Sequence, residues 1–182
     1  MDGFLDYTMD RLSSLTRYNT RKVIRKQSVM EHSGAVTLIA MVFSDYLNGM
    51  GIANDAERVL RMSILHDMDE VVSGDLPYDA KYSQGKLSEN LRNALHELTS
   101  YHVDMTLKMM KDRNLEHIYK GLLDEEHAKR TIEAKIVKLA DTADTIIYSM
   151  QEEKTGNRQL FREVRKHQTK KLHDLIDELL KK

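Results

Sequence analysis

The chain has 182 residues, of which 41% are hydrophobic and 31% charged; this is enough apolar material for one core, and it excludes a wholly disordered chain. The net charge of −1 gives no basic excess for stable nucleic-acid binding, and the absence of Cys excludes disulfides, thiolate metal sites and cysteine nucleophiles. No apolar stretch is long enough to span a bilayer, and the first residues do not resemble a signal peptide, so we expect a cytoplasmic protein.

The first third of the chain predicts two helices joined by a basic loop. Residues 4–16 carry apolar side chains at helical spacing, and residues 17–27 are basic without a clear period. Ser28 and Glu31 have the spacing of a capping box, so a helix should begin there and end near Gly49. Its expected apolar face consists of Val36, Ile39, Phe43 and Leu47.

The rest of the chain also shows helical periods. A second capping-box pattern at Asn54 and Glu57 predicts a helix that continues to about Val71, followed by a loop over 72–85. Further helices are expected over 86–112, 115–123, 126–154 and 158–181. Period-2 alternation is not sustained anywhere, which predicts an all-α helical bundle in a single domain over 1–182. The C-terminal helix over 158–181 should pack on this domain or on a partner subunit.

Two histidines are expected to point into the bundle. His32 lies four residues before Val36, and His66 lies near the end of the next predicted helix. A histidine on an apolar face is more often a hydrogen-bonded core residue than a metal ligand. However, Asp67 and Glu70 add negative charge at a helix C-terminus, where the dipole disfavours carboxylates. A bound cation would explain that cluster.

A third candidate ligand is Asp141, within the apolar sequence KIVKLADTADTIIY. A carboxylate on a mostly apolar helix is costly to bury unless it is paired or bound to a metal. Lys138 is the alternative partner, and Asp144, three residues later, reads as the more structural of the two acids. Together, two imidazoles and two carboxylates suit one divalent ion, Co²⁺, Mn²⁺, Zn²⁺, Fe²⁺ or Mg²⁺. These four candidate metal ligands are His32, His66, Asp67 and Asp141.

Three segments resemble the signature blocks H…HD…D of the HD-domain phosphohydrolases: RYNTRKVIRKQSVMEHS, ILHDMDEVVSGDLPYDAKY and KLADTADTIIY. They are most similar to the small 5′-deoxynucleotidase branch, the YfbR-like family, over roughly residues 10–150. The block H-D-x-x-E-x-x-x-G-D-x-P of that branch is matched by His66, Asp67, Glu70, Gly74, Asp75 and Pro77. The resemblance implies an HD-domain bundle, the same four metal ligands and a homodimer or higher homo-oligomer.

The resemblance also implies roles for other residues. Asp67 and Glu70 are the catalytic candidates, with Glu70 assisting proton transfer to or from the attacking water. Arg17 matches a residue that contacts phosphate, while Asp75 and Pro77 match a loop that meets the sugar. Two further substrate contacts are expected, Tyr18, which stands where this branch usually has Trp, and Arg25, from the basic stretch.

The expected activity is metal-dependent hydrolysis of deoxynucleoside 5′-monophosphates to deoxynucleoside and phosphate. One alternative is a deoxynucleoside triphosphate triphosphohydrolase, which the five cations between residues 17 and 26 keep open. Another is an inactive HD scaffold that only binds its ligand. In each case the partner is a small deoxynucleotide, with neither nucleic acid nor a membrane involved.

Overall fold

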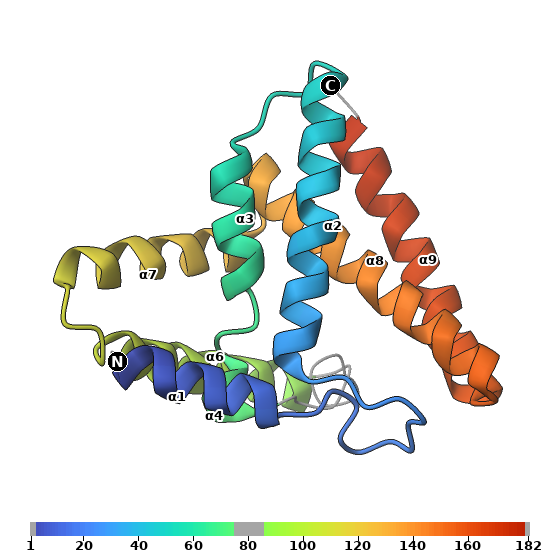
Figure 1. Ribbon diagram of the computed structural model, residues 1–182, viewed down its shortest axis with the longest axis horizontal. Coiled ribbons are helices and arrows are strands. Elements are labelled where there is room, and N and C mark those ends of the chain that lie inside the picture. Colours follow the sequence, from blue (N-terminus) through green and yellow to red (C-terminus); the bar gives the residue numbers. More distant parts are fainter. Residues whose placement is uncertain (1–2, 75–85, 181–182) are drawn as a thin grey trace. The chain divides into compact units, whose positions relative to one another are not determined.

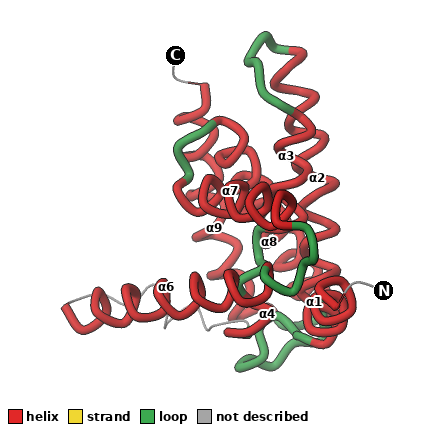
Figure 2. The backbone as a smooth tube through the Cα atoms, turned by 90° about the vertical axis from the view of Figure 1, so that its left-hand side faces the viewer, coloured by secondary structure: helices red, strands yellow, loops and turns green. Residues whose placement is uncertain are grey.

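Helices make up nearly all the regular structure in residues 3–74 and 86–180, which are the residues that the computed structural model describes (Figures 1 and 2). Within these ranges there is no β-strand, only an isolated bridge between Thr16 and Ser28, so the all-α prediction is confirmed. None of the described helices is both long and apolar enough to cross a membrane. The helices are α1 (Gly3–Ser14), α2 (Val29–Gly49), α3 (Ala56–Leu65), α4 (Glu70–Ser73), α6 (Lys86–Leu107), α7 (Arg113–Ala128), α8 (Ile132–Thr155) and α9 (Arg158–Leu180).

The chain packs as two compact units, each built from separate segments. The first unit comprises Met1–Lys22, Lys26–Glu31 and Asp67–Gly121. In it, α1 packs against α4 and α6, and Arg11 Nε donates a hydrogen bond to the carbonyl of Val71 at 3.0 Å. Phe4 and Leu12 of α1 are buried in this packing, which ties the N-terminal helix to the segment that follows residue 66.

The second unit comprises Val23–Arg25, His32–His66 and Leu122–Lys182. In it, α3 packs on α8, and α9 folds back along α8 as a helical hairpin (Figure 1). Phe161 of α9 is fully buried and meets the ring of Tyr148 edge to face, with 5.6 Å between the centroids. The C-terminal helix therefore packs on α8, whereas the single-domain organisation over 1–182 stays a prediction.

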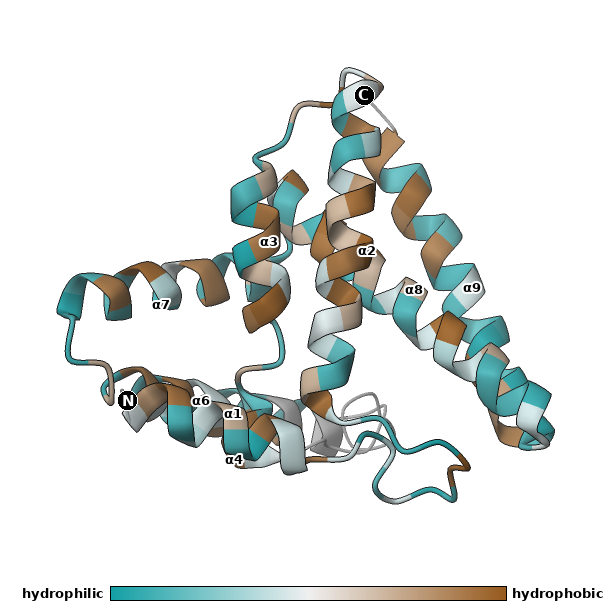
Figure 3. Ribbon diagram, viewed as in Figure 1, coloured by the Kyte–Doolittle hydropathy of each residue, from teal (hydrophilic) through white to brown (hydrophobic). Residues whose placement is uncertain are grey.

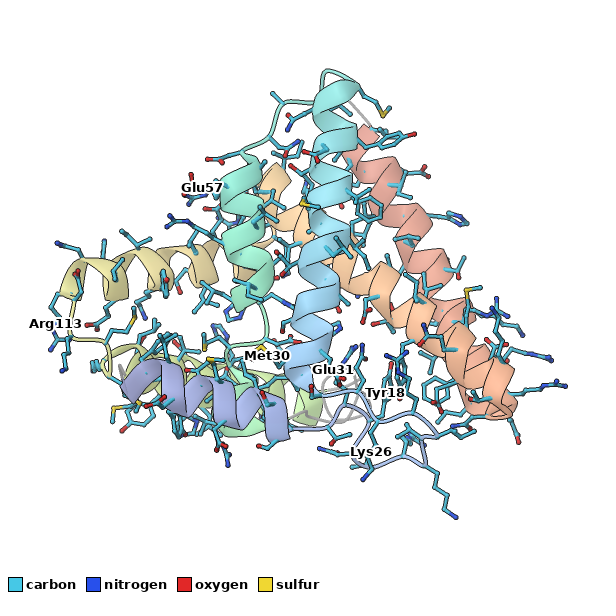
Figure 4. The ribbon with its side chains drawn as sticks, viewed as in Figure 1. Tyr18, Lys26, Met30, Glu31, Glu57 and Arg113 are labelled. Atoms are coloured by element: carbon cyan, nitrogen blue, oxygen red, sulfur yellow. The ribbon has the colours of Figure 1, made fainter. Side chains whose placement is uncertain are left out.

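The start of α2 forms as its capping box predicts. The backbone N–H of Glu31 donates to Ser28 Oγ at 3.1 Å, and the N–H of Ser28 donates to a carboxylate oxygen of Glu31 at 2.7 Å. These bonds satisfy donors that would otherwise lack partners at the helix end. Figure 4 shows Glu31 at this end of the helix, with Tyr18 and Lys26 on the preceding loop. The cap fixes the register that turns His32 inward.

The prediction of one helix from residue 54 to about 71 is wrong in two respects. The side chain of Asn54 bonds Ser44 on α2, and Asp55 caps α3 instead by accepting from the N–H of Arg58 at 3.0 Å. The helix then ends at Leu65, with His66 as its C-cap. A turn follows before the short helix α4, so residues 66–69 are not helical.

The later helices differ from expectation mainly at their ends. α6 stops at Leu107, and α7 is longer than the predicted 115–123. α8 begins six residues later than predicted, because Thr131 caps it by accepting from the N–H of Ala134. It ends as expected at Gly156, whose φ of 117° is a left-handed conformation that glycine adopts without strain.

Candidate metal centre

His66 is held in one orientation by its own helix. Its Nδ1 lies 2.7 Å from the carbonyl oxygen of Ser63, and the side chain is buried. A carbonyl only accepts, so we assign the hydrogen to Nδ1. The lone pair of a neutral imidazole then lies on Nε2, the nitrogen that faces away from α3.

Nδ1 of His32 also faces an oxygen acceptor, here a carboxylate in place of a backbone carbonyl. Its Nδ1 lies 2.6 Å from Oδ2 of Asp144 on α8, and both side chains are buried. A carboxylate bonded to one ring nitrogen fixes the tautomer and leaves the other nitrogen as a ligand atom. His32 therefore also presents the lone pair of Nε2.

The two Nε2 atoms face each other, and a carboxylate oxygen lies beside that of His32. Nε2 of His32 lies 3.3 Å from Nε2 of His66, and 3.4 Å from Oδ1 of Asp141. Nε2 of His32 thus faces two other acceptor atoms, Nε2 of His66 and Oδ1 of Asp141, in a largely buried place. That arrangement is unfavourable unless a positive charge lies among them. The donors therefore fit a cation.

Asp141 remains ionised in this setting. Lys138 Nζ donates to its Oδ2 at 2.6 Å, the partner that the sequence offered as an alternative to metal, and Oδ1 faces His32. Burial acts to raise the pKa of Asp141, but the positive charge of Lys138 acts to lower it, and this pKa lies well below the usual range. Lys138 and a metal ion are compatible partners because they use different oxygens.

Asp67 completes the donor group. It follows His66 directly, so the peptide bond alone keeps the two residues close. One ligand atom from each of His32, His66 and Asp67 lies within 4.8 Å of the other two. Asp141 lies beside His32 but is not part of this group of three, so its place as the fourth ligand stays a prediction. Imidazole and carboxylate donors together suit a borderline or hard divalent ion.

Asp144 is the residue that sequence reasoning undervalued. The sequence marked it as the more structural of the two acids, yet it holds the imidazole of His32. A signal was present: a buried metal-binding histidine needs an acceptor for its second nitrogen. Only the packing of α8 against the start of α2 shows which carboxylate supplies that acceptor.

The other predicted site residues are not tested by this geometry. Glu70 is buried in the first turn of α4, in the other compact unit from His32 and Asp141. Asp75 and Pro77 lie outside the described residues. Their roles stay predictions.

The basic loop before α2 is ordered by its own contacts. Arg17 Nη1 donates to Gln27 Oε1 at 3.2 Å, and its guanidinium lies over the ring of Tyr18, 5.6 Å from the centroid. Tyr18 has a φ of 56°, which is uncommon for a residue other than glycine. Substrate contact by these two residues remains a prediction.

Arg25 is fixed to α8 instead. Its guanidinium donates to the amide oxygen of Gln151, and its backbone N–H donates to a carboxylate oxygen of Glu152 at 2.7 Å. Glu152 also accepts from the N–H of Ile24 at 2.9 Å, and the hydroxyl of Tyr148 donates to the carbonyl of Arg25. The predicted role of Arg25 in phosphate binding likewise stays untested.

Known proteins resemble this chain in sequence and in fold. The 5′-deoxynucleotidase YfbR of Escherichia coli is 29% identical over 151 residues, which cover 82% of this chain and 72% of that protein. An HD-domain phosphohydrolase from Listeria innocua superposes with a TM-score of 0.82 at 23% identity, over 97% of this chain and 81% of the other. The HD phosphohydrolase DatZ of cyanophage S-2L, solved with dA and one catalytic Zn²⁺, gives a TM-score of 0.51 at 18% identity, over 94% and 96%. These two structures show the shared fold.

The family model described as 5′-deoxynucleotidase YfbR-like matches residues 4–181, nearly the whole chain. The match confirms the resemblance that the three sequence blocks indicated. The chain belongs to the YfbR-like 5′-deoxynucleotidase family and is an HD-type, metal-dependent nucleotide phosphohydrolase.

Proposed function

We propose that this enzyme hydrolyses deoxynucleoside 5′-monophosphates to deoxynucleoside and inorganic phosphate. The observation that carries the proposal is the group of facing acceptors, Nε2 of His32, Nε2 of His66 and Oδ1 of Asp141. Family membership supports the choice of substrate, since the E. coli relative bears the name of that activity.

The proposed metal ligands are His32, His66, Asp67 and Asp141. A divalent ion held there polarises a phosphoryl oxygen and makes water more acidic, which supports hydrolysis near neutral pH. The ion is one of Mn²⁺, Co²⁺, Fe²⁺, Zn²⁺ and Mg²⁺, and the zinc of the cyanophage enzyme supports the borderline members of that series.

Residues of the chain carry the remaining steps. Asp144 keeps the proton on Nδ1 of His32 and so keeps its Nε2 available. In the proposal Glu70 accepts the proton of the attacking water, and Arg17 holds phosphate oxygens. Water attacks phosphorus, the bond from phosphorus to the 5′ oxygen breaks, and the nucleoside leaves with a proton on that oxygen.

A second candidate activity is the release of triphosphate from a deoxynucleoside triphosphate. The observation in its favour is the run of five cations between residues 17 and 26, of which Arg21, Lys22, Arg25 and Lys26 are exposed. A longer phosphate chain would need more positive charge than a monophosphate.

One experiment separates these activities. The purified chain is loaded with Mn²⁺, Co²⁺ or Zn²⁺ and incubated with every deoxy- and ribonucleoside mono- and triphosphate, and the released phosphate species are separated by ion exchange. We expect inorganic phosphate from deoxynucleoside monophosphates. Release of triphosphate would replace the proposal with the second candidate, and no hydrolysis with any metal would indicate a binding scaffold. His66→Ala, prepared in parallel, controls for contaminating phosphatases.

A further inference from the structure

Two hydroxyl side chains, Ser63 and Thr37, join the helices that carry the proposed histidine ligands. These helices, α2 and α3, follow each other in the chain and lie side by side (Figures 1 and 2). Figure 3 shows α2 as mainly apolar along its middle, and no charged residue stands between His32 and Asp45 in the sequence. Hydroxyl groups in such surroundings find their hydrogen-bond partners within the protein. Their bonds therefore show how α2 and α3 are fixed to each other.

The bonds begin at the acceptor that orients His66. The carbonyl oxygen of Ser63 lies 2.7 Å from Nδ1 of His66, and the hydroxyl of Ser63 donates to Oγ1 of Thr37 at 3.2 Å. The hydroxyl of Thr37 donates in turn to the carbonyl of Ser33 at 2.7 Å, and Ser33 directly follows His32. Hydrogen bonds thus connect the ring of His66 to the backbone beside His32.

Thr37 is the member of this group on which the link between the helices depends. Each hydroxyl has one hydrogen, and that of Thr37 goes to the carbonyl of Ser33, so its oxygen accepts from Ser63. The hydroxyl of Ser63 also lies 2.9 Å from the carbonyl oxygen of Leu60 in its own helix. Removal of the Thr37 hydroxyl would leave Ser63 bonded within α3 and would break this link to α2.

The two imidazoles stand at the spacing that one ion requires. Nε2 of His32 lies 3.3 Å from Nε2 of His66, and the ring planes are inclined by 64°. Two nitrogens bound to one ion at about 2.0–2.1 Å with a tetrahedral angle lie about 3.3 Å apart. Two acceptor nitrogens repel each other before an ion arrives, so the protein must hold the rings at this distance. A site that is ordered beforehand loses less freedom when the ion binds.

We propose that Thr37 is a positioning residue of the metal centre, which acts through Ser63 to hold His66 at ligand distance from His32. The inference rests on the proposed function, because it takes the two histidines as ligands of one ion. The alternative is that the two hydroxyls only satisfy each other where α2 meets α3. In that case their loss would lower stability and leave metal binding unchanged.

Co²⁺ binding separates these two roles without requiring turnover. The metal-free full chain is titrated with Co²⁺, and its visible absorption reports both the affinity and the arrangement of the ligands. Thr37→Val keeps the branched shape of the side chain and removes its hydroxyl. We expect its Co²⁺ affinity to fall by roughly 10-fold, with shifted absorption bands, as for the loss of a partner outside the ligand shell. Thr37→Ser, which keeps a hydroxyl, should retain the affinity and the bands of the wild type.

Thr106→Val is the matched control. Thr106 of α6 is buried and donates to the carbonyl of His102, four residues earlier, at 2.9 Å, the same kind of bond that Thr37 makes to Ser33. Its variant should bind Co²⁺ as the wild type does. Equal Co²⁺ affinity and equal bands in Thr37→Val and Thr106→Val would overturn the proposal.

Ser63→Ala tests the same link from the other helix, and it keeps the proposal testable if Thr37→Val does not fold. We expect Ser63→Ala to lose Co²⁺ affinity to a similar extent. The double variant should lose no more than either single variant, because all three lack the same bond. Additive losses would mean that the two hydroxyls act separately, which contradicts the proposal.

Nucleotide hydrolysis shows which of the two proposals fails. If Thr37→Val binds Co²⁺ more weakly in a chain whose wild type hydrolyses no nucleotide, the proposed function fails and the positioning role stands. If the wild type releases phosphate from deoxynucleoside monophosphates and Thr37→Val binds Co²⁺ equally well, only the positioning role fails.

Discussion

Asp141 and Asp144 lie one turn apart on α8, and they meet opposite sides of the same imidazole. Asp144 is buried, with Oδ2 at 2.6 Å from Nδ1 of His32. Asp141 is partly exposed, with Oδ1 at 3.4 Å from Nε2 and its other oxygen on Lys138. Two similar side chains therefore have different surroundings: Asp144 bonds the imidazole from within the core, and Asp141 lies between the imidazole and an ammonium at a partly exposed position.

The difference shows that two carboxylates on one helix can have different roles at the same site. The buried carboxylate is suited to orienting the imidazole that it bonds, whereas the partly exposed one faces Nε2 of the same ring and is suited to binding an ion. Farther along α8, Glu152 is fully buried and bonds backbone N–H groups of residues 24 and 25. The carboxylate of Glu152 bonds these backbone groups and not the two histidines. A variant at Glu152 therefore serves as a comparison for variants that change the metal site.

Removing a ligand should have the largest effect. We expect Asp141→Ala, His66→Ala and Asp67→Ala each to abolish metal retention and turnover, because each leaves the ion short of a donor. Metal content is measured by atomic emission after gel filtration, and hydrolysis by phosphate release. A variant that kept stoichiometric metal and wild-type activity would remove that residue from the ligand set.

Glu70 is a carboxylate that we expect to transfer a proton without binding the metal ion. Glu70→Ala should retain the metal and lose activity by ~10²–10⁴-fold, the usual contribution of a positioned acid–base group. Asp69→Ala, at the adjacent acidic residue, is the matched control and should keep its activity. An unchanged rate in Glu70→Ala would exclude it from the mechanism.

Asp144→Asn examines the orienting carboxylate directly. The asparagine oxygen can still accept from Nδ1 of His32, but it carries no charge, so metal affinity should fall by roughly 10- to 100-fold without being lost. Competition with a chromophoric chelator gives the affinity. If Asp144 only orients His32, the loss of metal affinity in Asp144→Asn should be smaller than the loss in Asp141→Ala. Equal losses would mean that both acids bind the metal.

Glu152→Gln should have the smallest effect and should change stability rather than metal binding. Burial acts to raise the pKa of Glu152, but the N–H groups of Ile24 and Arg25 and the amide of Asn157 lower it below its ordinary value of 4.5. The native state thus binds this proton less tightly than the unfolded state. The stabilisation is complete above the ordinary pKa and is lost as the pH falls through the native one.

At neutral pH we expect Glu152→Gln to lower the free energy of unfolding by about 1–3 kcal/mol, and the difference from wild type should shrink in acid. Urea unfolding at both pH values measures it. Glu163→Gln is the control, because Glu163 is exposed and pairs only with the exposed Lys166 at 3.1 Å among the described contacts. A Glu152→Gln deficit that persists unchanged in acid would contradict this account.

Local patterns in the sequence predicted much of this protein. The capping box at Ser28 sets the start of α2 and so turns His32 inward. It could be predicted because its hydrogen bonds join residues only three positions apart. The left-handed end of α8 at Gly156 is local in the same sense. The helix from residue 54 was predicted too long, since the partner of Asn54 lies on α2 and not in its own helix.

The sequence by itself determined the helical class, the inward histidines and the choice of candidate ligands, since helical period, capping and block spacing are properties of neighbouring residues. Only the tertiary structure decided which acceptor each Nδ1 faces and which acid orients His32. The choice of that acid depends on a contact between helices far apart in the chain, α2 and α8. No local pattern encodes it, because the distance involved is set by packing.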